Sequence, residues 1–246
     1  ARAAIATEVF RKASNGPAYL ERVLQECHLK VDVISQDVEA NLGFQTAVAL
    51  NGSPPASTIC WDSGGASFQI TSMAPQEDEG AQPQLRSWVG AFGTGNTTAL
   101  LVESVLRRRF AEHPSPNPVS AEQAKELVKL LQSHFDPAPD WLAGANVVAI
   151  GGINCMFKVT SEVLGKSHYT LSEVRSALQS TLELSDEEIA KLPCCSGELR
   201  EPPGLIVPKV CLLLAVMEHC GMQEVHFCPA VGSCPGVLID SSRYTC

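Results

Sequence analysis

The sequence predicts an α/β fold on three observations. Strand-like and helix-like segments alternate along most of the 246 residues. Two apolar strand patterns, Thr58–Trp61 and Asn146–Ile150, are each followed closely by a Gly-Gly pair. The composition, 45% hydrophobic and 18% charged, is that of an ordinary globular protein. A chain of this size can bury a large core.

The first 55 residues contain the first elements and end in a strong break. Residues 3–27 begin with a short apolar run and continue as a helix that Asn15-Gly16-Pro17 interrupts. Val31–Ser35 has a strand pattern, and Asp37–Leu50 has a helical one. Asn51–Pro55 is a cluster of turn residues, so we expect a boundary there between residues 1–55 and residues 56–246.

The rest of the chain continues the alternation. Residues 73–84 are polar and rich in turn formers, which predicts a surface loop between strands. Ser120 and Gln123 have the form of a capping box at the start of a helix. The further predicted elements are helices over Thr98–Phe110, Ser120–Phe135, Cys155–Leu164, Leu171–Leu182, Asp186–Lys191 and Pro208–Cys220, and a strand over Glu224–Phe227.

Charge and cysteine usage limit the function classes. A formal net charge of −9 argues against nucleic acid as a partner, although a local site with a metal ion can still bind an anionic substrate. The longest apolar stretch, Val210–Met217, is too short to cross a bilayer, and the N-terminus has no signal-peptide pattern. The ten cysteines show no regular framework, which favours free thiols in the cytoplasm. A zinc cluster of Cys220, Cys228 and Cys234 is the alternative.

The segment Thr58–Ile70 is the first candidate for chemistry. An apolar strand delivers Asp62 at its end, and Gly64-Gly65 permits a tight turn whose amides can approach an anion. Ser67 and Gln69 add polar groups on the next strand, and Asp62 is suited to Mg²⁺. The alternative is a plain β-hairpin that uses glycine only for its turn.

Two further glycine turns follow. Gly151-Gly152 joins a strand to a helix, and a helix start after such a turn can bind phosphate. Close packing of strand and helix would explain the same pair of glycines. Gly93-Thr94-Gly95 precedes another helix and is weaker evidence. Glu39 lies just after a strand pattern and is the candidate catalytic carboxylate, although most glutamates near a helix start are solvated.

The order of these features resembles the exopolyphosphatase/guanosine pentaphosphate phosphohydrolase (Ppx/GppA) family. The resemblance covers nearly the whole chain. The segments that carry it are Ala6–Asn15, which contains Arg11, then Val33–Ala40, Asp62–Gln69, Ala149–Gly152 and Gly204–Pro208.

The resemblance implies an actin-like ATPase/sugar-kinase fold, with two ribonuclease-H-like lobes facing a cleft. Residues 1–55 would be the remnant of the first lobe, and residues 56–246 the second. Glu39 would be the general base, and Asp62 would hold Mg²⁺. The implied phosphate-binding residues are Arg11, Gly64, Gly65, Ser67, Gln69, Gly151 and Gly152.

The implied activity is removal of terminal phosphate from polyphosphate or guanosine pentaphosphate. We also expect that the chain can form a homodimer. The sequence departs from the family pattern at several places: the family's earlier Asp-x-Gly-Ser-Asn hairpin is absent from the sequence, Gln69 replaces a Glu, Gly93 replaces an Arg, and Val231–Gly236 replaces a Gly-x-Leu-Arg-Glu-Gly motif. An inactive relative that binds phosphate or nucleotide is therefore the main alternative, followed by an actin-like ATP-binding module.

Overall fold

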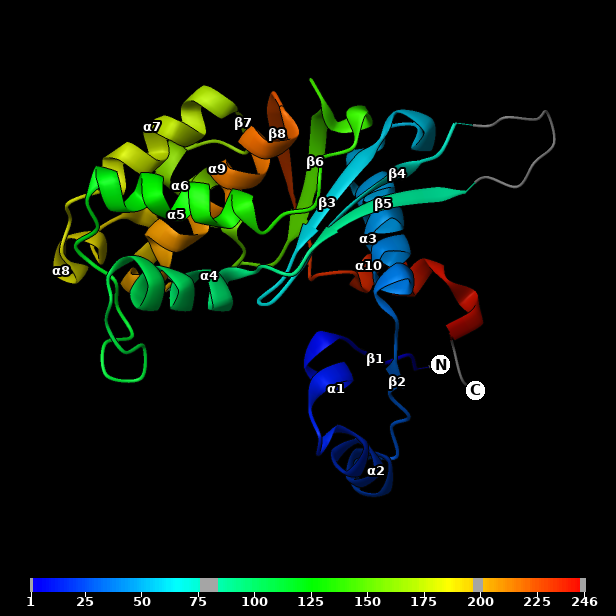
Figure 1. Cartoon of the computed structure of the whole chain (residues 1–246). Helices are drawn as coiled ribbons and strands as arrows, with labels where there is room; N and C mark the ends of the chain where they lie inside the picture. Colours follow the sequence, from blue (N-terminus) through cyan, green and yellow to red (C-terminus); the bar gives the residue numbers. More distant parts are fainter. Residues whose placement is uncertain (1, 76–83, 197–200, 244–246) are drawn as a thin grey trace.

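The computed structural model describes residues 2–75, 84–196 and 201–243 (Figure 1). The strands are β1 (Ile5–Ala6), β2 (Asp32–Val33), β3 (Ile59–Ser63), β4 (Phe68–Met73), β5 (Leu85–Gly90), β6 (Asn146–Gly151), β7 (His168–Thr170) and β8 (Glu224–Pro229). The α-helices are α1 (Glu8–Lys12), α2 (Gly16–Cys27), α3 (Gln36–Asn51), α4 (Thr94–Leu100), α5 (Ala121–Ser133), α6 (Met156–Leu164), α7 (Leu171–Thr181), α8 (Asp186–Ile189), α9 (Ile206–Cys220) and α10 (Cys234–Ile239).

A six-stranded mixed sheet organises the larger part of the chain. Its strand order is β5-β4-β3-β6-β8-β7. The central strands β3, β6 and β8 are parallel, whereas β4 and β5 continue the sheet on one side as antiparallel hairpin partners. On the other side, β7 pairs antiparallel with β8. The predicted α/β class is confirmed.

Alternate residues of the central strands serve two hydrophobic layers, as the two-residue repeat of a strand requires. Trp61 and Ala149 belong to the larger cluster. It lies on the face of the sheet that is covered by α5, α6, α7 and α9. Cys60 and Val148 belong to a smaller cluster with Phe44 of α3. Helices α3 and α10 pack against each other on that second face (Figure 1).

Helix α9 is the centre of the larger layer. It packs against α4, α5, α6 and α7, and most of its side chains are fully buried. Because its sequence is apolar on all sides, it can be stable in water only when other helices surround it. Among the described residues, Pro203–Cys220 is the one helical segment long and apolar enough to cross a membrane, and 78% of it is buried inside the fold.

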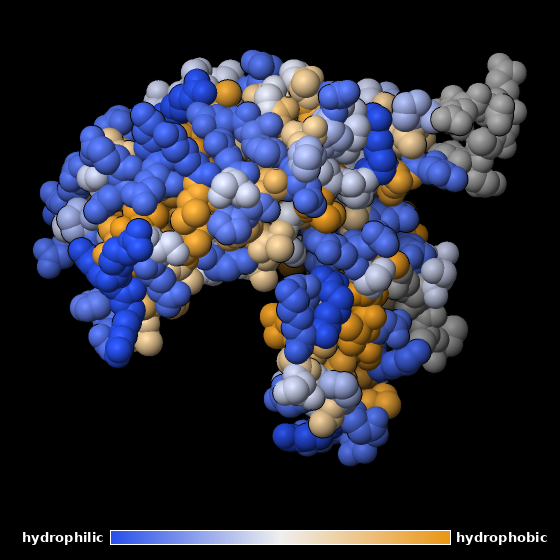
Figure 2. Space-filling view, viewed as in Figure 1, coloured by the Kyte–Doolittle hydropathy of each residue, from blue (hydrophilic) through white to orange (hydrophobic). Residues whose placement is uncertain are grey.

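The N-terminal residues form a small separate lobe. β1 and β2 make a two-stranded parallel sheet, with α1 and α2 beside it (Figure 1). α1 has no buried residue, and α2 buries only Gly16. Figure 2 shows a hollow between this lobe and the larger body, with apolar side chains exposed on the lobe. Val9 and Tyr19 are among the exposed apolar residues.

Several predicted elements differ in extent. The helix predicted to reach Phe110 stops earlier, because α4 is followed by a single π-helical turn over Leu101–Val105 and then by Arg107 in a left-handed conformation. The predicted loop over 73–84 lies mostly outside the described residues. The boundary predicted at residue 55 stays a prediction. α3, which precedes it, packs on β3 and β6.

The cysteines of the described part of the chain are free thiols. Those residues also contain no group of three or more His, Cys, Asp or Glu side chains that could hold a metal ion. Cys220 and Cys228 are buried, whereas Cys234 is exposed. The alternative of a zinc cluster formed by these three cysteines is therefore wrong.

The crossing of α10 over α3 leads to a stability prediction. A methyl group on Gly236 would lie 2.1 Å from the carbonyl oxygen of Leu42, and the Gly236 amide donates to Thr46 Oγ1 at 2.8 Å. Gly236→Ala must therefore push the helices apart, and we expect it to lower the free energy of unfolding by about 1–3 kcal/mol in urea titrations. Ile239→Ala, at an exposed position of the same helix, is the control. Equal stability of the two variants would contradict the packing described here.

Candidate functional site

The segment between β3 and β4 is a tight hairpin turn. The Gly64 amide donates to the Ser67 carbonyl at 2.9 Å, and Ser63 pairs with Phe68 across the hairpin. Gly64 and Gly65 are exposed at the tip. The hairpin that the sequence left as one alternative is therefore present. Its exposed glycine backbone also remains open to an anion, since no side chain covers it at these two positions.

The third glycine turn supports the first. The Gly95 amide donates to the Gly65 carbonyl at 3.0 Å, and Asn96 Nδ2 donates to the Ala66 carbonyl at 3.3 Å. A methyl group on Gly93 would lie 2.3 Å from the Ala66 nitrogen. Gly93 therefore allows the start of α4 to pack directly on the hairpin turn, where a longer side chain would collide with the backbone.

Gly151 and Gly152 end β6, the parallel neighbour of β3. Gly151 is buried, and a methyl group there would lie 2.7 Å from Cys155 Sγ, so close packing of strand and helix explains this glycine. Gly152 lines a cavity of about 540 Å³ together with Gly64, Gly65 and Gly95. The structure thus brings all three glycine turns together around one cavity.

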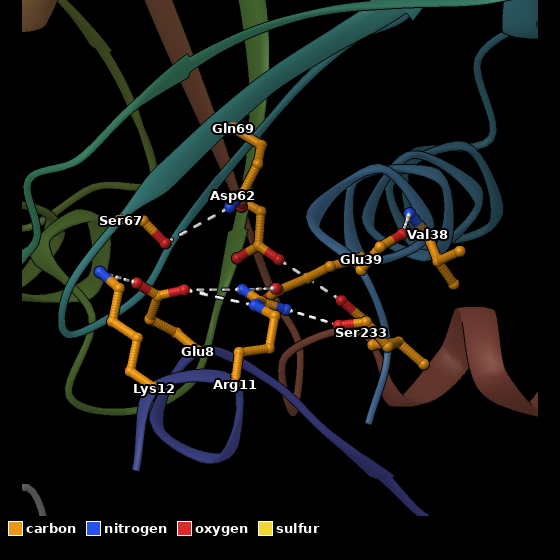
Figure 3. Close-up of polar contacts among 11 residues, drawn as sticks. Glu8, Arg11, Lys12, Val38, Glu39, Asp62, Ser67, Gln69 and Ser233 are labelled. Atoms are coloured by element: carbon orange, nitrogen blue, oxygen red, sulfur yellow. Dashed lines mark hydrogen bonds and ion pairs between the residues drawn. The ribbon is translucent and has the colours of Figure 1, made fainter. Parts of the chain in front are cut away.

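Glu39 lies in the first turn of α3, which begins where the strand β2 ends. Ser35 caps this helix by accepting a hydrogen bond from the Val38 amide at 3.3 Å. The cap fixes the first turn and directs Glu39 toward α1 and the end of β3 (Figure 3). Glu39 is partly buried, with 17% of its side chain exposed.

Arg11 of α1 binds this carboxylate. Its guanidinium donates to Glu39 Oε2 at 2.9 Å, to Glu8 Oε2 at 3.1 Å and to the Ile34 carbonyl at 2.7 Å (Figure 3). Although partial burial lowers the pKa of Arg11, its hydrogen bonds to Glu39 and Glu8 raise it above the ordinary value. Lys12 also pairs with Glu8. Arg11, predicted to bind phosphate, is therefore held by two carboxylates.

Asp62 lies at the end of β3, beside Glu39. Burial and the nearby negative charge of Glu39 raise the pKa of Asp62 to about 7, while hydrogen bonds from Ser233 and the Ser63 backbone oppose the shift. Ser233 Oγ donates to Asp62 Oδ2 at 3.4 Å. Two carboxyl groups thus share one partly buried region.

Ser67 and Gln69 lie on the same face of the hairpin as Asp62. Asp62 and Gln69 are direct cross-strand partners, and Gln69 Nε2 donates to Ser67 Oγ at 3.5 Å (Figure 3). Gln69 is buried, whereas Ser67 is partly exposed. Both therefore border the carboxyl region, on the side away from α1.

Four polar residues near these groups were missed by the sequence analysis. Ser233 and Glu8 contact Asp62 and Arg11, and no local pattern marks either of them. Glu201 and Lys209 line the cavity of the glycine turns. The sequence does point to Lys209, because it is a single lysine inside the apolar run of α9. A lysine buried in such a helix requires a partner.

Comparisons with known proteins agree with this architecture. The model of the Ppx/GppA phosphatase family matches residues 3–244. A solved Ppx/GppA family member from Aquifex aeolicus has 19% identity and a TM-score of 0.70, covering 98% of this chain and 73% of that one. An exopolyphosphatase from Cytophaga hutchinsonii has 15% identity and a TM-score of 0.66, covering 96% and 73%. No curated protein matches the chain significantly.

At these identities the solved structures establish the fold alone. They confirm the predicted actin-like ATPase fold. The family match spans almost the whole sequence. The resemblance inferred from the sequence is confirmed, and the chain belongs to the Ppx/GppA phosphatase family.

Proposed function

We propose that this chain hydrolyses phosphoanhydride bonds and releases terminal phosphate from inorganic polyphosphate or guanosine pentaphosphate. The observation that carries the proposal is the meeting of Asp62, Glu39 and the exposed glycine turns at one edge of the sheet. Membership of a phosphatase family supports it. Phosphoryl transfer requires mainly positioning and charge neutralisation, and this edge offers groups for both.

The glycine turns would hold the phosphates. Gly64, Gly65 and Gly152 face one cavity, and a phosphate can approach their backbone closely because no Cβ intervenes. Ser67 and Gln69 would add a hydroxyl and an amide on the Asp62 side of the hairpin. Arg11 would contribute positive charge, although it is tied to Glu39 and Glu8 in this structure.

Glu39 would act as the general base. In this role its carboxylate orients a water molecule and takes its proton as the water attacks the terminal phosphorus. The hydrogen bond from Arg11 to Oε2 fixes the direction of the carboxylate. The other oxygen, Oε1, is the one that would accept the proton of the water.

The carboxyl region suits Mg²⁺. Asp62 and Glu39 supply oxygen atoms, and a nearby cation would offset both the burial of the Asp62 carboxylate and its repulsion by Glu39, which together raise the pKa of Asp62. Asp62 would hold the ion, with the remaining ligands supplied by phosphate oxygens and water, as is usual for Mg²⁺ at phosphate sites. When bound, the ion neutralises charge that develops on the phosphate oxygens.

An inactive phosphate- or nucleotide-binding relative is the second candidate. The pairing of Glu39 with Arg11 favours it, because the guanidinium already occupies one oxygen of the carboxylate that would have to bind the attacking water. The buried Gln69 favours it as well, since it provides an amide beside Asp62 where the family pattern has a carboxylate. The two candidates differ in hydrolysis and not in binding.

Phosphate release with and without Glu39 separates the two candidates. We expect the purified chain with Mg²⁺ to release phosphate from polyphosphate or guanosine pentaphosphate, and Glu39→Ala to slow the release by about a hundredfold or more, since the general base is lost. Asp37→Ala, an exposed carboxylate in the same helical turn, should retain activity. If the wild-type chain and Glu39→Ala are equally inert while both bind the ligand, the second candidate is correct.

The raised pKa of Asp62 makes stability depend on pH. The folded chain holds the Asp62 proton up to about pH 7, but the unfolded chain releases it near 3.8, so this carboxyl stabilises the fold most in acid and progressively less as pH rises to 7. In EDTA at pH 8, Asp62→Asn should therefore be more stable than the wild-type chain by about 2–4 kcal/mol. The difference should shrink at pH 5.

Urea unfolding at the two pH values measures this effect. Asp37→Asn, at an exposed position, is the control and should stay within about 1 kcal/mol of the wild-type chain at both. An Asp62→Asn variant that is less stable than the wild-type chain at pH 8 would show that the carboxylate makes stronger interactions than those described.

A further inference from the structure

A buried ion pair lies at the cavity of the glycine turns. Lys209 of α9 pairs with Glu201, and each side chain is only 2% exposed. Lys209 Nζ also donates to the Asn154 carbonyl at 2.6 Å. Both residues line the 540 Å³ cavity with Gly64, Gly65 and Gly152. Burial removes both charges from water, and this desolvation costs free energy. Well-packed apolar residues at the same two positions would avoid that cost.

The carboxylate of this pair has an unused oxygen. Lys209 contacts Glu201 Oε1, whereas Oε2 is buried and accepts no hydrogen bond within residues 2–75, 84–196 and 201–243. A buried carboxylate oxygen without a donor is unfavourable, and a donor group on a ligand would remove the penalty. The ion pair therefore holds an unpaired acceptor, with a cation beside it, just beneath the lining of the cavity that the glycine turns share.

The charges decide which ligand fits. Inorganic polyphosphate carries acceptor oxygens and negative charge, so it cannot donate to Glu201 and is repelled by it. A divalent cation is disfavoured, because the Lys209 ammonium already contacts the same carboxylate. The sugar of a nucleoside has neutral hydroxyl donors, and a cavity of about 540 Å³ is in the size range of small-molecule sites.

We propose that Glu201 and Lys209 form a subsite for the sugar hydroxyls of a nucleoside phosphate whose phosphates lie on the glycine turns. Glu201 Oε2 accepts from a hydroxyl group, and Lys209 holds the carboxylate in place. The chain then prefers nucleoside phosphates to inorganic polyphosphate. This inference rests on the phosphate-binding part of the proposed function and is independent of hydrolysis.

Isothermal titration calorimetry on the full chain with Mg²⁺ tests the subsite. GTP and inorganic tripolyphosphate present similar phosphate chains, so the difference between them isolates the nucleoside. We expect GTP to bind at least about tenfold more tightly than tripolyphosphate. One hydrogen bond to a charged group is strong enough to give an affinity difference of this size. 2′,3′-Dideoxy-GTP, which lacks the hydroxyls, should lose most of this preference.

A double variant tests the two side chains. Glu201→Gln combined with Lys209→Met removes both charges, so neither is left buried alone, and such replacements are often tolerated. The affinity of this variant for GTP should fall to within about twofold of its affinity for tripolyphosphate. Arg22→Met with Glu26→Gln, which removes an exposed pair in α2, should keep the tenfold preference.

Four results would overturn the inference. The first two are tripolyphosphate binding as tight as GTP in the wild-type chain, and no binding of GTP. The third is undiminished binding of 2′,3′-dideoxy-GTP to the wild-type chain. The fourth is an unchanged GTP preference in the folded double variant, which would favour as the nucleoside site the apolar hollow near Leu50, Ile153 and Val231, which Gly152 also lines.

Failure of this inference differs from failure of the proposed function. A chain that hydrolyses polyphosphate without any preference for GTP disproves the subsite and leaves the hydrolase proposal intact. A chain that prefers GTP but releases no phosphate supports the subsite and disproves hydrolysis.

Discussion

Strands β3 and β6 pair in parallel with Asp62 opposite Ile150, and the positions of Asp62 and of the turns that follow these two strands depend on this pairing. Parallel neighbours end at the same edge of a sheet, so the turns that follow them must lie side by side. Asp62, the β3–β4 turn and Gly151-Gly152 meet for this reason. Helix α3 packs on the same edge, because a methyl group on Gly43 would already be in van der Waals contact with Asp62 Oδ2, at 3.4 Å.

The elements that the sequence predicts well are those whose stability is local or whose pattern is long. α3 and α5 begin at capping residues, α9 is a long apolar run, and the capping box of Ser120 and Gln123 is present. β7 and α10 were not predicted, and β5 was implied only as the strand that follows the 73–84 loop. β7 and α10 are short elements, at a sheet edge and over α3, and they exist because a neighbour supplies hydrogen bonds or packing. Their own sequences carry too little information to specify them.

The same distinction applies to the site. Asp62 and Gly151-Gly152 follow the strand patterns of β3 and β6, so sequence order and a parallel sheet are sufficient to predict that they gather. Glu39 follows β2 of the other sheet, and the packing of α3 on β3 and β6 brings it to them. The contacts among them are not predictable in this way. Arg11 reaches Glu39 across 28 positions of sequence, and Ser233 reaches Asp62 across 171. Such pairings depend on how the small lobe and the C-terminal residues pack, which no local pattern records.

Charge balance explains how the departures from the family pattern fit this site. Asp62 already has a raised pKa, because it is buried beside Glu39. A carboxylate at the buried position 69, the direct partner of Asp62 across the hairpin, would add a third negative charge to the same region. Gln69 avoids that repulsion, and Arg11 neutralises Glu39. The region is therefore stable without a cation. A cation would bind less tightly here than at a site with three carboxylates. In the proposed function, affinity for ligand would then come more from the glycine turns and from groups such as Glu201 and Lys209.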